Sequence, residues 1–143
     1  MNGRAFVDTN VLVYAHDASS PAKNKVARQL VEDLWESRAG VVSTQVLQEF
    51  YVNVRRKVAR PLPAAEAKRL VADYLRWEVV ANDGDAILEA IDLEERFKLS
   101  FWDAMIVRAA LGAGAETLLT EDLSHGQRYG DVQVVNPFRA STR

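Results

Sequence analysis

The sequence predicts an α/β fold in which a parallel β-sheet carries helices on both faces. Short apolar runs that suit buried strands alternate along the chain with longer segments whose apolar residues recur at helical spacing. This alternation favours parallel strands joined by helical connections. The chain has 143 residues and no internal repeat or low-complexity tract, and its length is usual for one domain. We therefore expect residues 1–143 to form a single domain.

The first strand is expected at residues 4–8, an apolar run that ends in an acid. Asn10 can cap the short apolar helix that follows, because its side chain can accept a hydrogen bond from a free backbone N–H. A longer helix is expected over residues 19–38, with Pro21 in its first turn and Gly40 beyond its end. Its apolar stripe consists of Val26, Leu30, Val31, Leu34 and Trp35.

The middle of the chain repeats this order. Residues 41–43 form an expected strand, and Thr44 can cap a helix over residues 44–60. Two prolines end that helix, and another helix is expected over residues 64–76. The apolar stripe of the 44–60 helix consists of Val46, Leu47, Phe50, Tyr51, Val54 and Val58.

The last third of the chain completes the alternation. A strand is expected at residues 78–80, and Asp83 or Asp85 can cap a helix that runs to Lys98. A helix over residues 100–111 carries very few charges and is therefore expected to be buried. The remaining expected strands are residues 117–120 and 132–135.

Composition excludes several kinds of site and partner. There are 18 basic and 20 acidic residues, so no overall field draws the protein to nucleic acid and any such contact needs a local basic patch. No cysteine is present, which excludes disulfides and cysteine nucleophiles and fits a reducing compartment. Neither a signal peptide nor the roughly 20 consecutive apolar residues of a membrane span is found. We expect a soluble cytoplasmic protein with no membrane association.

Four acids carry the functional prediction. Asp8 and Asp122 follow expected strands, and in parallel sheets ligand sites form beyond the carboxyl ends of the strands. Asp103 lies in the first turn of the apolar helix, where burying a carboxylate is costly unless a positive charge meets it. The helix N-terminus supplies part of that charge, and a metal ion would supply more. Glu49 lies at the flank of the apolar stripe of the 44–60 helix, where the edge of a cleft can form.

Taken one at a time, each acid also has a simpler interpretation. Asp8 can be a turn residue, and Asp122 an ordinary loop residue. Ser100 and Asp103 match a capping box, in which the acid only satisfies a backbone N–H. Glu49 can be a solvated helix acid. The functional interpretation therefore depends on the four acids in combination.

In combination, four segments resemble in order the acidic motifs of PIN-domain nucleases. They are Phe6–Leu12, Gln48–Phe50, Leu99–Ala104 and Leu119–Leu123, and they contain Asp8, Glu49, Asp103 and Asp122 respectively. The ending, from His125 to Phe138, resembles the tail of VapC-type toxins. The resemblance covers nearly the whole chain and departs at none of the four acids. No single motif is specific, but four acids in register are a strong signal.

The resemblance implies a fold and a site. The fold would be a three-layer α/β/α sandwich with a central parallel sheet of four or five strands. Asp8, Asp103 and Asp122 would line the metal cleft, with Glu49 alongside as a further catalytic acid. The supporting residues, which could orient those carboxylates or their waters, would be Thr9, Asn10, Ser100 and Thr120. All-oxygen ligands suit Mg²⁺ or Mn²⁺ better than zinc.

The resemblance also implies an activity and partners. The activity would be metal-dependent hydrolysis of RNA phosphodiester bonds, with a 5′-phosphate and a 3′-hydroxyl as products. The protein would be the toxin of a toxin–antitoxin pair, with an antitoxin that covers the cleft, and would form a homodimer. The helices at residues 19–38 and 44–60 are amphipathic enough to serve as such surfaces, although core packing explains them equally well.

Four basic residues are candidates for RNA contact. Arg55, Arg56 and Lys57 follow Glu49 on the same expected helix, and Arg60 lies at its end. A solvated basic helix end that suits the helix dipole is an equally good interpretation.

Aromatic and histidine side chains near the acids have simpler expected roles. Trp102 is expected in the core, with stacking on a base as the alternative. His16 and His125 are expected to be ordinary surface or loop residues, because the mechanism needs no histidine.

Two other classes of protein compete with the nuclease. One is a catalytically silent PIN-like module that binds RNA or protein, although such a module has no physical need for four acids. The other is an acid-pocket α/β protein. Phosphatases with an aspartate nucleophile need a second acid two residues after the first, where this chain has Asn10. Receiver domains need a late loop lysine, but the last lysine is Lys98, in an expected helix.

Overall fold

The computed structural model describes residues 3–139. Six strands form one sheet in the order β3-β2-β1-β4-β6-β5. Neighbouring strands are parallel except β5 and β6, which are antiparallel. The strands are β1 (Ala5–Val7), β2 (Gly40–Ser43), β3 (Glu78–Val80), β4 (Thr117–Leu119), β5 (Arg128–Tyr129) and β6 (Val132–Val135).

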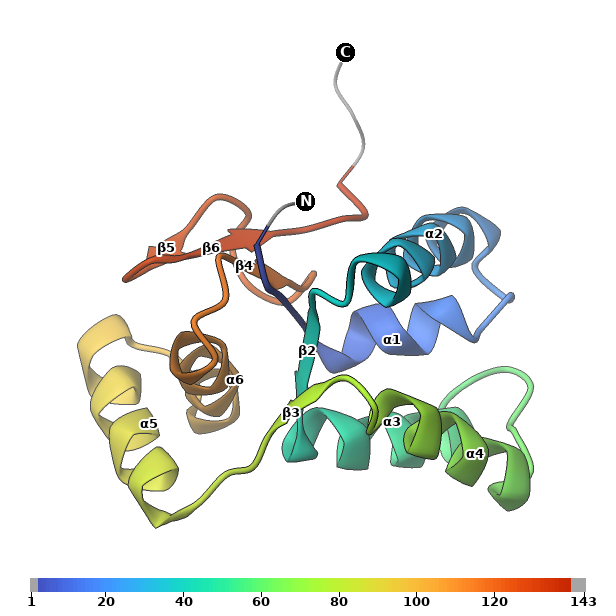
Figure 1. The fold of residues 1–143 in the computed structure, drawn as a ribbon, viewed down its shortest axis with the longest axis horizontal. Coiled ribbons are helices and arrows are strands. Elements are labelled where there is room, and N and C mark those ends of the chain that lie inside the picture. The colour runs from blue at the N-terminus through green and yellow to red at the C-terminus, as the bar shows by residue number, and fades with distance from the viewer. Residues whose placement is uncertain (1–2, 140–143) are drawn as a thin grey trace.

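Helices cover the sheet on both faces. Helices α1 and α2 lie on one side of the strands, and α5 and α6 lie on the other (Figure 1). Helix α3 packs against both α1 and α4. The helices are α1 (Thr9–Ala15), α2 (Pro21–Ser37), α3 (Thr44–Arg56), α4 (Ala64–Tyr74), α5 (Gly84–Phe97) and α6 (Phe101–Gly112). The predicted three-layer α/β/α fold is confirmed, but the sheet has six strands instead of the expected four or five, and β5 at its edge is antiparallel.

The order of the strands reverses between β1 and β4. The chain runs outward from β1 through β2 to β3, and α5 and α6 then carry it back to β4, on the other side of β1. Val7 of β1 pairs with Leu119 of β4 at the carboxyl ends of both strands. In open α/β sheets the crevice at such a reversal is the usual place for a ligand. Asp8 and Asp122 follow these two strands.

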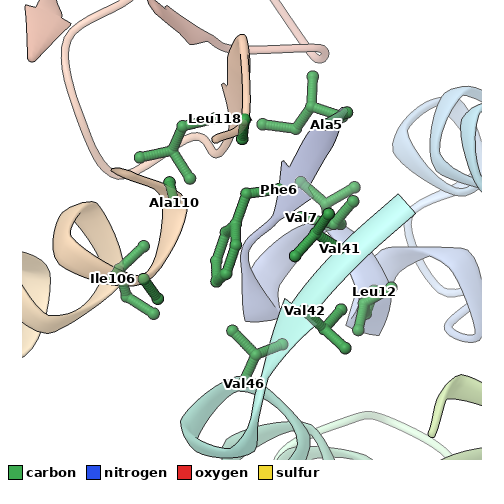
Figure 2. Close-up of a cluster of buried hydrophobic side chains, with 14 of the residues drawn as sticks. Ala5, Phe6, Val7, Leu12, Val41, Val42, Val46, Ile106, Ala110 and Leu118 are labelled. Atoms are coloured by element: carbon green, nitrogen blue, oxygen red, sulfur yellow. The ribbon is translucent and has the colours of Figure 1, made fainter. Parts of the chain in front are cut away.

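The core explains the continuous apolar runs of the strands. Side chains of β1, β2 and β4 meet residues from helices on both faces of the sheet (Figure 2). Each of these side chains is at most 3% exposed: Phe6, Val7, Leu12, Val41, Val42, Val46, Ile106, Ala110 and Leu118. Each large side chain buried in this way contributes about 1.5–3 kcal/mol. The strand ends that bear the acids are therefore anchored in a rigid core.

Two helix caps lie one or two residues earlier than predicted. Asp8, not Asn10, caps α1, and its Oδ1 accepts a hydrogen bond from the backbone N–H of Thr9 at 2.8 Å. Ser43, not Thr44, caps α3, and its Oγ accepts from the N–H of Val46 at 3.2 Å. Both capping residues have extended backbones, because each helix begins directly at the end of a strand.

The end of α2 corrects the role predicted for Gly40. The helix ends at Ser37, and Arg38 adopts the left-handed conformation with φ 60° that glycine usually takes there. Gly40 instead lies in β2, where a Cβ would come within 2.6 Å of the Trp77 ring. Close packing of this indole on the strand therefore requires glycine at residue 40.

The next two helices end earlier than predicted. Helix α3 ends at Arg56 and α4 at Tyr74, so Arg60 lies beyond α3. After α3 the chain folds back, and the N–H of Leu62 donates to the carbonyl of Val54 at 2.9 Å.

Three residues of the predicted apolar stripes are more than a third exposed: Val26, Trp35 and Tyr51.

Strand β5 is absent from the predicted elements because two residues carry no periodicity. It pairs with β6 across a turn in which Gly130 has φ 59°, a value that favours glycine.

Within the described part of the chain, no helix combines the length and the apolar character needed to cross a membrane.

Candidate active site

All four acids line one cleft of about 460 Å³, here called the acid cleft. Asp8 follows β1, Glu49 lies on α3, Asp103 lies in the first turn of α6, and Asp122 follows β4. Four elements that are distant in sequence thus converge at the carboxyl ends of β1 and β4. No single element could place these carboxylates together.

Asp8 is the most buried of the four acids, with 6% of its surface exposed. Its Oδ1 accepts from the N–H of Thr9 at 2.8 Å, and its Oδ2 accepts from the hydroxyl of Thr120 at 2.8 Å. Burial raises the pKa of Asp8 to about 6, although these two hydrogen bonds oppose the rise and the charges of Asp122 and Glu49 add to it. At neutral pH the Asp8 side chain is therefore mostly ionised, in surroundings that disfavour its negative charge.

Asn10 and Thr120 hold Asp122 in place. The amide nitrogen of Asn10 donates to Asp122 Oδ2 at 3.0 Å and to Thr120 Oγ1 at 3.3 Å. Thr120 is fully buried, and its Oγ1 also accepts from the N–H of Asp122 at 3.1 Å. Since the same hydroxyl donates to Asp8, one threonine links the acids that follow two neighbouring strands.

Glu49 is half-buried at the edge of the cleft. The hydroxyl of Thr9 donates to Glu49 Oε1 at 2.9 Å, across 40 residues of sequence. The amide nitrogen of Gln45 lies 3.5 Å from Glu49 Oε2. Both carboxylate oxygens therefore have a neighbouring donor.

Asp103 is half-buried at the start of α6. Its N–H donates to Ser100 Oγ at 3.1 Å, so Ser100 caps the helix as the sequence predicts. Burial raises the pKa of Asp103, the Ser100 side chain beside the carboxyl group opposes the rise, and the charges of Asp122 and Glu49 add to it. Ser100 thus caps the helix, while Asp103 lines the cleft.

The candidate RNA-binding residues Arg55, Arg56 and Lys57 have different environments in the structure. Lys57 lines the acid cleft, and Arg56 is exposed on the last turn of α3. The guanidinium of Arg55 donates to the carbonyl of Leu62 at 3.0 Å. Arg55 therefore stabilises the loop after α3.

Trp102 is not in the core, contrary to the prediction. It is 63% exposed and lines the acid cleft beside Asp103. Because nearly every residue of α6 is apolar, the sequence of this helix does not reveal which side faces solvent.

The two histidines have different environments. His16 was predicted to be a surface or loop residue, but it is half-buried, and its Nε2 lies 2.7 Å from the hydroxyl of Tyr74. Its ring also packs edge-on against Phe50, and burial lowers its pKa. The prediction missed this because α3 and α4 close over the end of α1. His125 is exposed, and its Nδ1 accepts from the N–H of Asn136 at 3.1 Å.

The donor chemistry of the cleft fits a hard divalent cation. Carboxylate, amide and hydroxyl oxygens surround it, and the strained charge of Asp8 would be relieved by a positive ion. Among residues 3–139, no group of three or more acidic, histidine or cysteine side chains is arranged to hold an ion by itself. Mg²⁺ usually binds through only one or two carboxylates and keeps several waters. The residues therefore fit a cation of this kind.

A second hollow adjoins the acid cleft. This apolar groove of about 760 Å³ lies between α3 and α4 and shares Gln48 and Val52 with the cleft. Its walls include Tyr51, Val52 and Leu75, which are 37%, 45% and 54% exposed. This groove cannot be predicted from the helical pattern of the sequence, because apolar residues that line an exposed hollow resemble core residues there.

Comparison with known proteins identifies the family of the chain. The family model for the PIN domain matches residues 5–129. None of the curated proteins matches the chain.

Solved structures of low identity share its fold. A toxin–antitoxin complex from Klebsiella pneumoniae has a TM-score of 0.69 at 20% identity and covers 93% of this chain and 97% of its own. VapC20 from Mycobacterium tuberculosis, described as a toxin that cleaves the sarcin-ricin loop, has a TM-score of 0.60 at 21% identity, with 80% and 86% covered. VapBC2 from Rickettsia felis, bound to a DNA fragment from its promoter, has a TM-score of 0.64 at 18% identity, with 91% and 96% covered.

Proposed function

Because the chain belongs to the PIN domain family, we propose that it is a Mg²⁺- or Mn²⁺-dependent endoribonuclease that hydrolyses RNA phosphodiester bonds. The observation that carries this proposal is the acid cleft. Carboxylates from four separate elements line it, at the point where the strand order of the sheet reverses. A domain that only binds RNA or protein has no need to hold acids against their mutual repulsion.

The proposed roles follow from the environment of each acid. Asp8, Asp103 and Asp122 would hold the cation, one or two of them directly and the others through its waters. Thr120 and Asn10 fix the carboxylates of Asp8 and Asp122 by hydrogen bonds, and so orient them before an ion arrives. The bound cation would neutralise charge on the scissile phosphate and favour ionisation of water.

Glu49 is the proposed general base. Thr9 donates to its Oε1 at 2.9 Å, and Gln45 lies near its Oε2. An ionised carboxylate oxygen keeps a second lone pair, so Glu49 can still take a proton from the attacking water.

Contacts to RNA are proposed from two residues at the cleft. Lys57 can bind a phosphate, and the exposed indole of Trp102 can stack on a base. Arg56, on the last turn of α3, is the next candidate for RNA contact. Arg55 takes a structural role instead, because its guanidinium already donates to the backbone.

We propose that an antitoxin neutralises the enzyme. The apolar groove supports this partner, because an apolar segment bound there would lead directly into the acid cleft at Gln48 and Val52. One protein of similar fold, from Klebsiella pneumoniae, is described as a toxin–antitoxin complex. The chain would thus be the toxin of such a pair, a single domain that acts on RNA in the cytoplasm.

A homodimer is also proposed. Three neighbouring apolar residues of α5 support it, because Ile87, Leu88 and Ile91 are 43%, 63% and 42% exposed. Light scattering on the free protein measures the mass directly, and a monomeric mass at micromolar concentration would remove this proposal.

The decisive test of the activity is cleavage of labelled single-stranded RNA by protein purified free of antitoxin. Wild type and Asp8→Asn are compared with Mg²⁺, with Mn²⁺ and with EDTA. Metal-dependent cutting that is lost in Asp8→Asn is the expected result, because asparagine keeps the shape but removes the charge that holds the ion. No cutting on a broad RNA panel, together with no ion uptake by calorimetry, would leave a catalytically silent binding module as the better explanation.

A further inference from the structure

Gln45 occupies an unusual position beside the acid cleft. It is the second residue of α3 and only 8% exposed, and it lines the cleft. Its Nε2 lies 3.5 Å from Glu49 Oε2 and 3.5 Å from the backbone carbonyl of Trp102. One amide therefore connects the acid of α3 with the first turn of α6, one residue before Asp103.

The orientation of this amide is set by its neighbours. Both nearby atoms, a carboxylate oxygen and a carbonyl oxygen, accept hydrogen bonds. Rotating the amide would place Gln45 Oε1 against them, and the contacts would become repulsive. The nitrogen therefore faces Glu49 and Trp102.

The same orientation leaves Gln45 Oε1 without a partner. This oxygen is buried and accepts no hydrogen bond from any described residue. Burying an unpaired polar atom lowers stability, whereas an apolar side chain of similar length has no such cost. A packing role alone would favour methionine or leucine here. The donor end of the amide must supply the advantage.

We propose that Gln45 is a positioning residue of the nuclease, one that holds the Glu49 carboxylate and sets the spacing of Glu49 and Asp103 across the cleft. Thr9 restrains Glu49 Oε1, and Gln45 restrains Glu49 Oε2, so the carboxylate cannot rotate freely. The contact with Trp102 ties α3 to the helix that carries Asp103. This inference rests on the proposed function.

Gln45→Met tests it, because methionine keeps the length and removes the amide. Gln29→Met is the matched control: Gln29 also donates to an acid four residues later on its helix, Asp33, at 2.9 Å, but it is exposed on α2. Three quantities are compared with wild type: kcat and KM for RNA cleavage, the Mn²⁺ affinity by calorimetry, and the melting temperature of the metal-free protein.

We expect Gln45→Met to lower kcat by about tenfold or more, as loss of a neighbour that orients a ligand or catalytic acid typically does. KM should change little because Gln45 makes no proposed contact with RNA. The melting temperature should stay the same or rise, since the unpaired oxygen is gone. Gln29→Met should match wild type in all three.

The alternative is a purely structural role, and the measurements separate the two. A lower melting temperature with unchanged kcat and Mn²⁺ affinity would make Gln45 a packing residue and overturn the proposal. Gln45→Leu repeats the test if the methionine variant does not fold. Wild type that binds Mn²⁺ without cutting RNA would refute the nuclease, and unchanged Mn²⁺ affinity in Gln45→Met would then overturn this inference too. Wild type that neither cuts RNA nor binds Mn²⁺ would refute both the proposed nuclease and the positioning role of Gln45.

Discussion

The acid cleft and the apolar groove adjoin and share two residues, yet they are built in opposite ways. The cleft concentrates like charges, and it holds them with hydrogen bonds from Thr9, Asn10 and Thr120. The groove has almost no polar surface, and its apolar side chains stay exposed between two helices. Each hollow has a cost that the isolated protein does not recover: charge repulsion in one, and contact of apolar surface with water in the other.

On the proposed function, this difference would combine catalysis and its control on one surface. A cation would relieve the site that burial and repulsion destabilise, and an apolar partner would relieve the site that exposure destabilises. The two requirements meet at α3, whose residues face both hollows. If the comparison is right, substitutions in the cleft will change catalysis and substitutions in the groove will change partner binding.

The largest expected effect is on catalysis. Asp103→Asn should lower kcat/KM for RNA by about a thousandfold, because the variant loses a charge that we propose holds the cation at the reacting phosphate. Asp85→Asn is the matched control, since Asp85 also lies in the first turn of a helix but is exposed on α5, outside the cleft. Equal losses of kcat/KM in Asp103→Asn and Asp85→Asn would show that the acid cleft has no particular role in catalysis.

The next effect is on stability and its dependence on pH. The pKa of Asp8 is about 6 in the folded protein, against 3.8 ordinarily, and this difference is worth about 3 kcal/mol. Since the folded state holds the proton more tightly, the stability from this group is complete below pH 4. It is then lost as pH rises through 6. Urea unfolding of metal-free wild type should therefore show stability falling over this window.

The variant Asp8→Asn tests whether Asp8 causes this pH dependence. Its free energy of unfolding should change little between about pH 4 and pH 6, and without metal it should be more stable than wild type at pH 7.5. Adding Mg²⁺ should stabilise wild type and leave the variant unchanged, because an ion that binds only the folded state stabilises it. A variant less stable than wild type at pH 7.5 would contradict the idea that the cleft sacrifices stability.

A smaller effect is expected in the groove. Leu75→Lys places a charge where an apolar partner would bind, and it should weaken binding of the co-expressed antitoxin by about tenfold or more. Val26→Lys is the control, because Val26 is also an exposed apolar residue, on α2 and outside the groove. Titration by calorimetry distinguishes them, and equal affinities would remove the groove as the docking surface.

The smallest effect is expected at Lys57, an exposed residue that lines the acid cleft. Lys57→Gln should raise KM for RNA by about threefold at moderate salt and reduce the salt dependence of binding by about one counterion. The control is Lys25→Gln, an exposed lysine on α2. An unchanged salt slope in Lys57→Gln would mean that Lys57 makes no phosphate contact.

Several features of the fold could be predicted because they depend on neighbouring residues alone. The parallel sheet followed from short apolar runs that alternate with helical stripes. Ser100 and Asp83 were recognisable as caps, because capping depends on a few consecutive residues. The position of Asp8 directly after β1 was visible for the same reason.

Other features were out of reach because they depend on which elements meet. That Asn10 donates to Asp122, 112 residues away, follows from β1 lying next to β4. Trp102 is exposed and His16 is half-buried because of how α3, α4 and α6 pack, and not because of their own hydrophobicity. Gln45 carried no signal, since glutamine in a helix is ordinary until a carboxylate and a carbonyl are placed beside it.

The sequence by itself thus determined the kinds of element, their order and the acids at their ends, because periodicity and capping are local. Tertiary structure alone decided which acids share a cleft, which apolar surfaces stay open, and which polar atoms are buried. The physical reason is that burial and electrostatic energy depend on distances in space. Two residues far apart in the sequence come close only when the order of the strands in the sheet places their elements side by side.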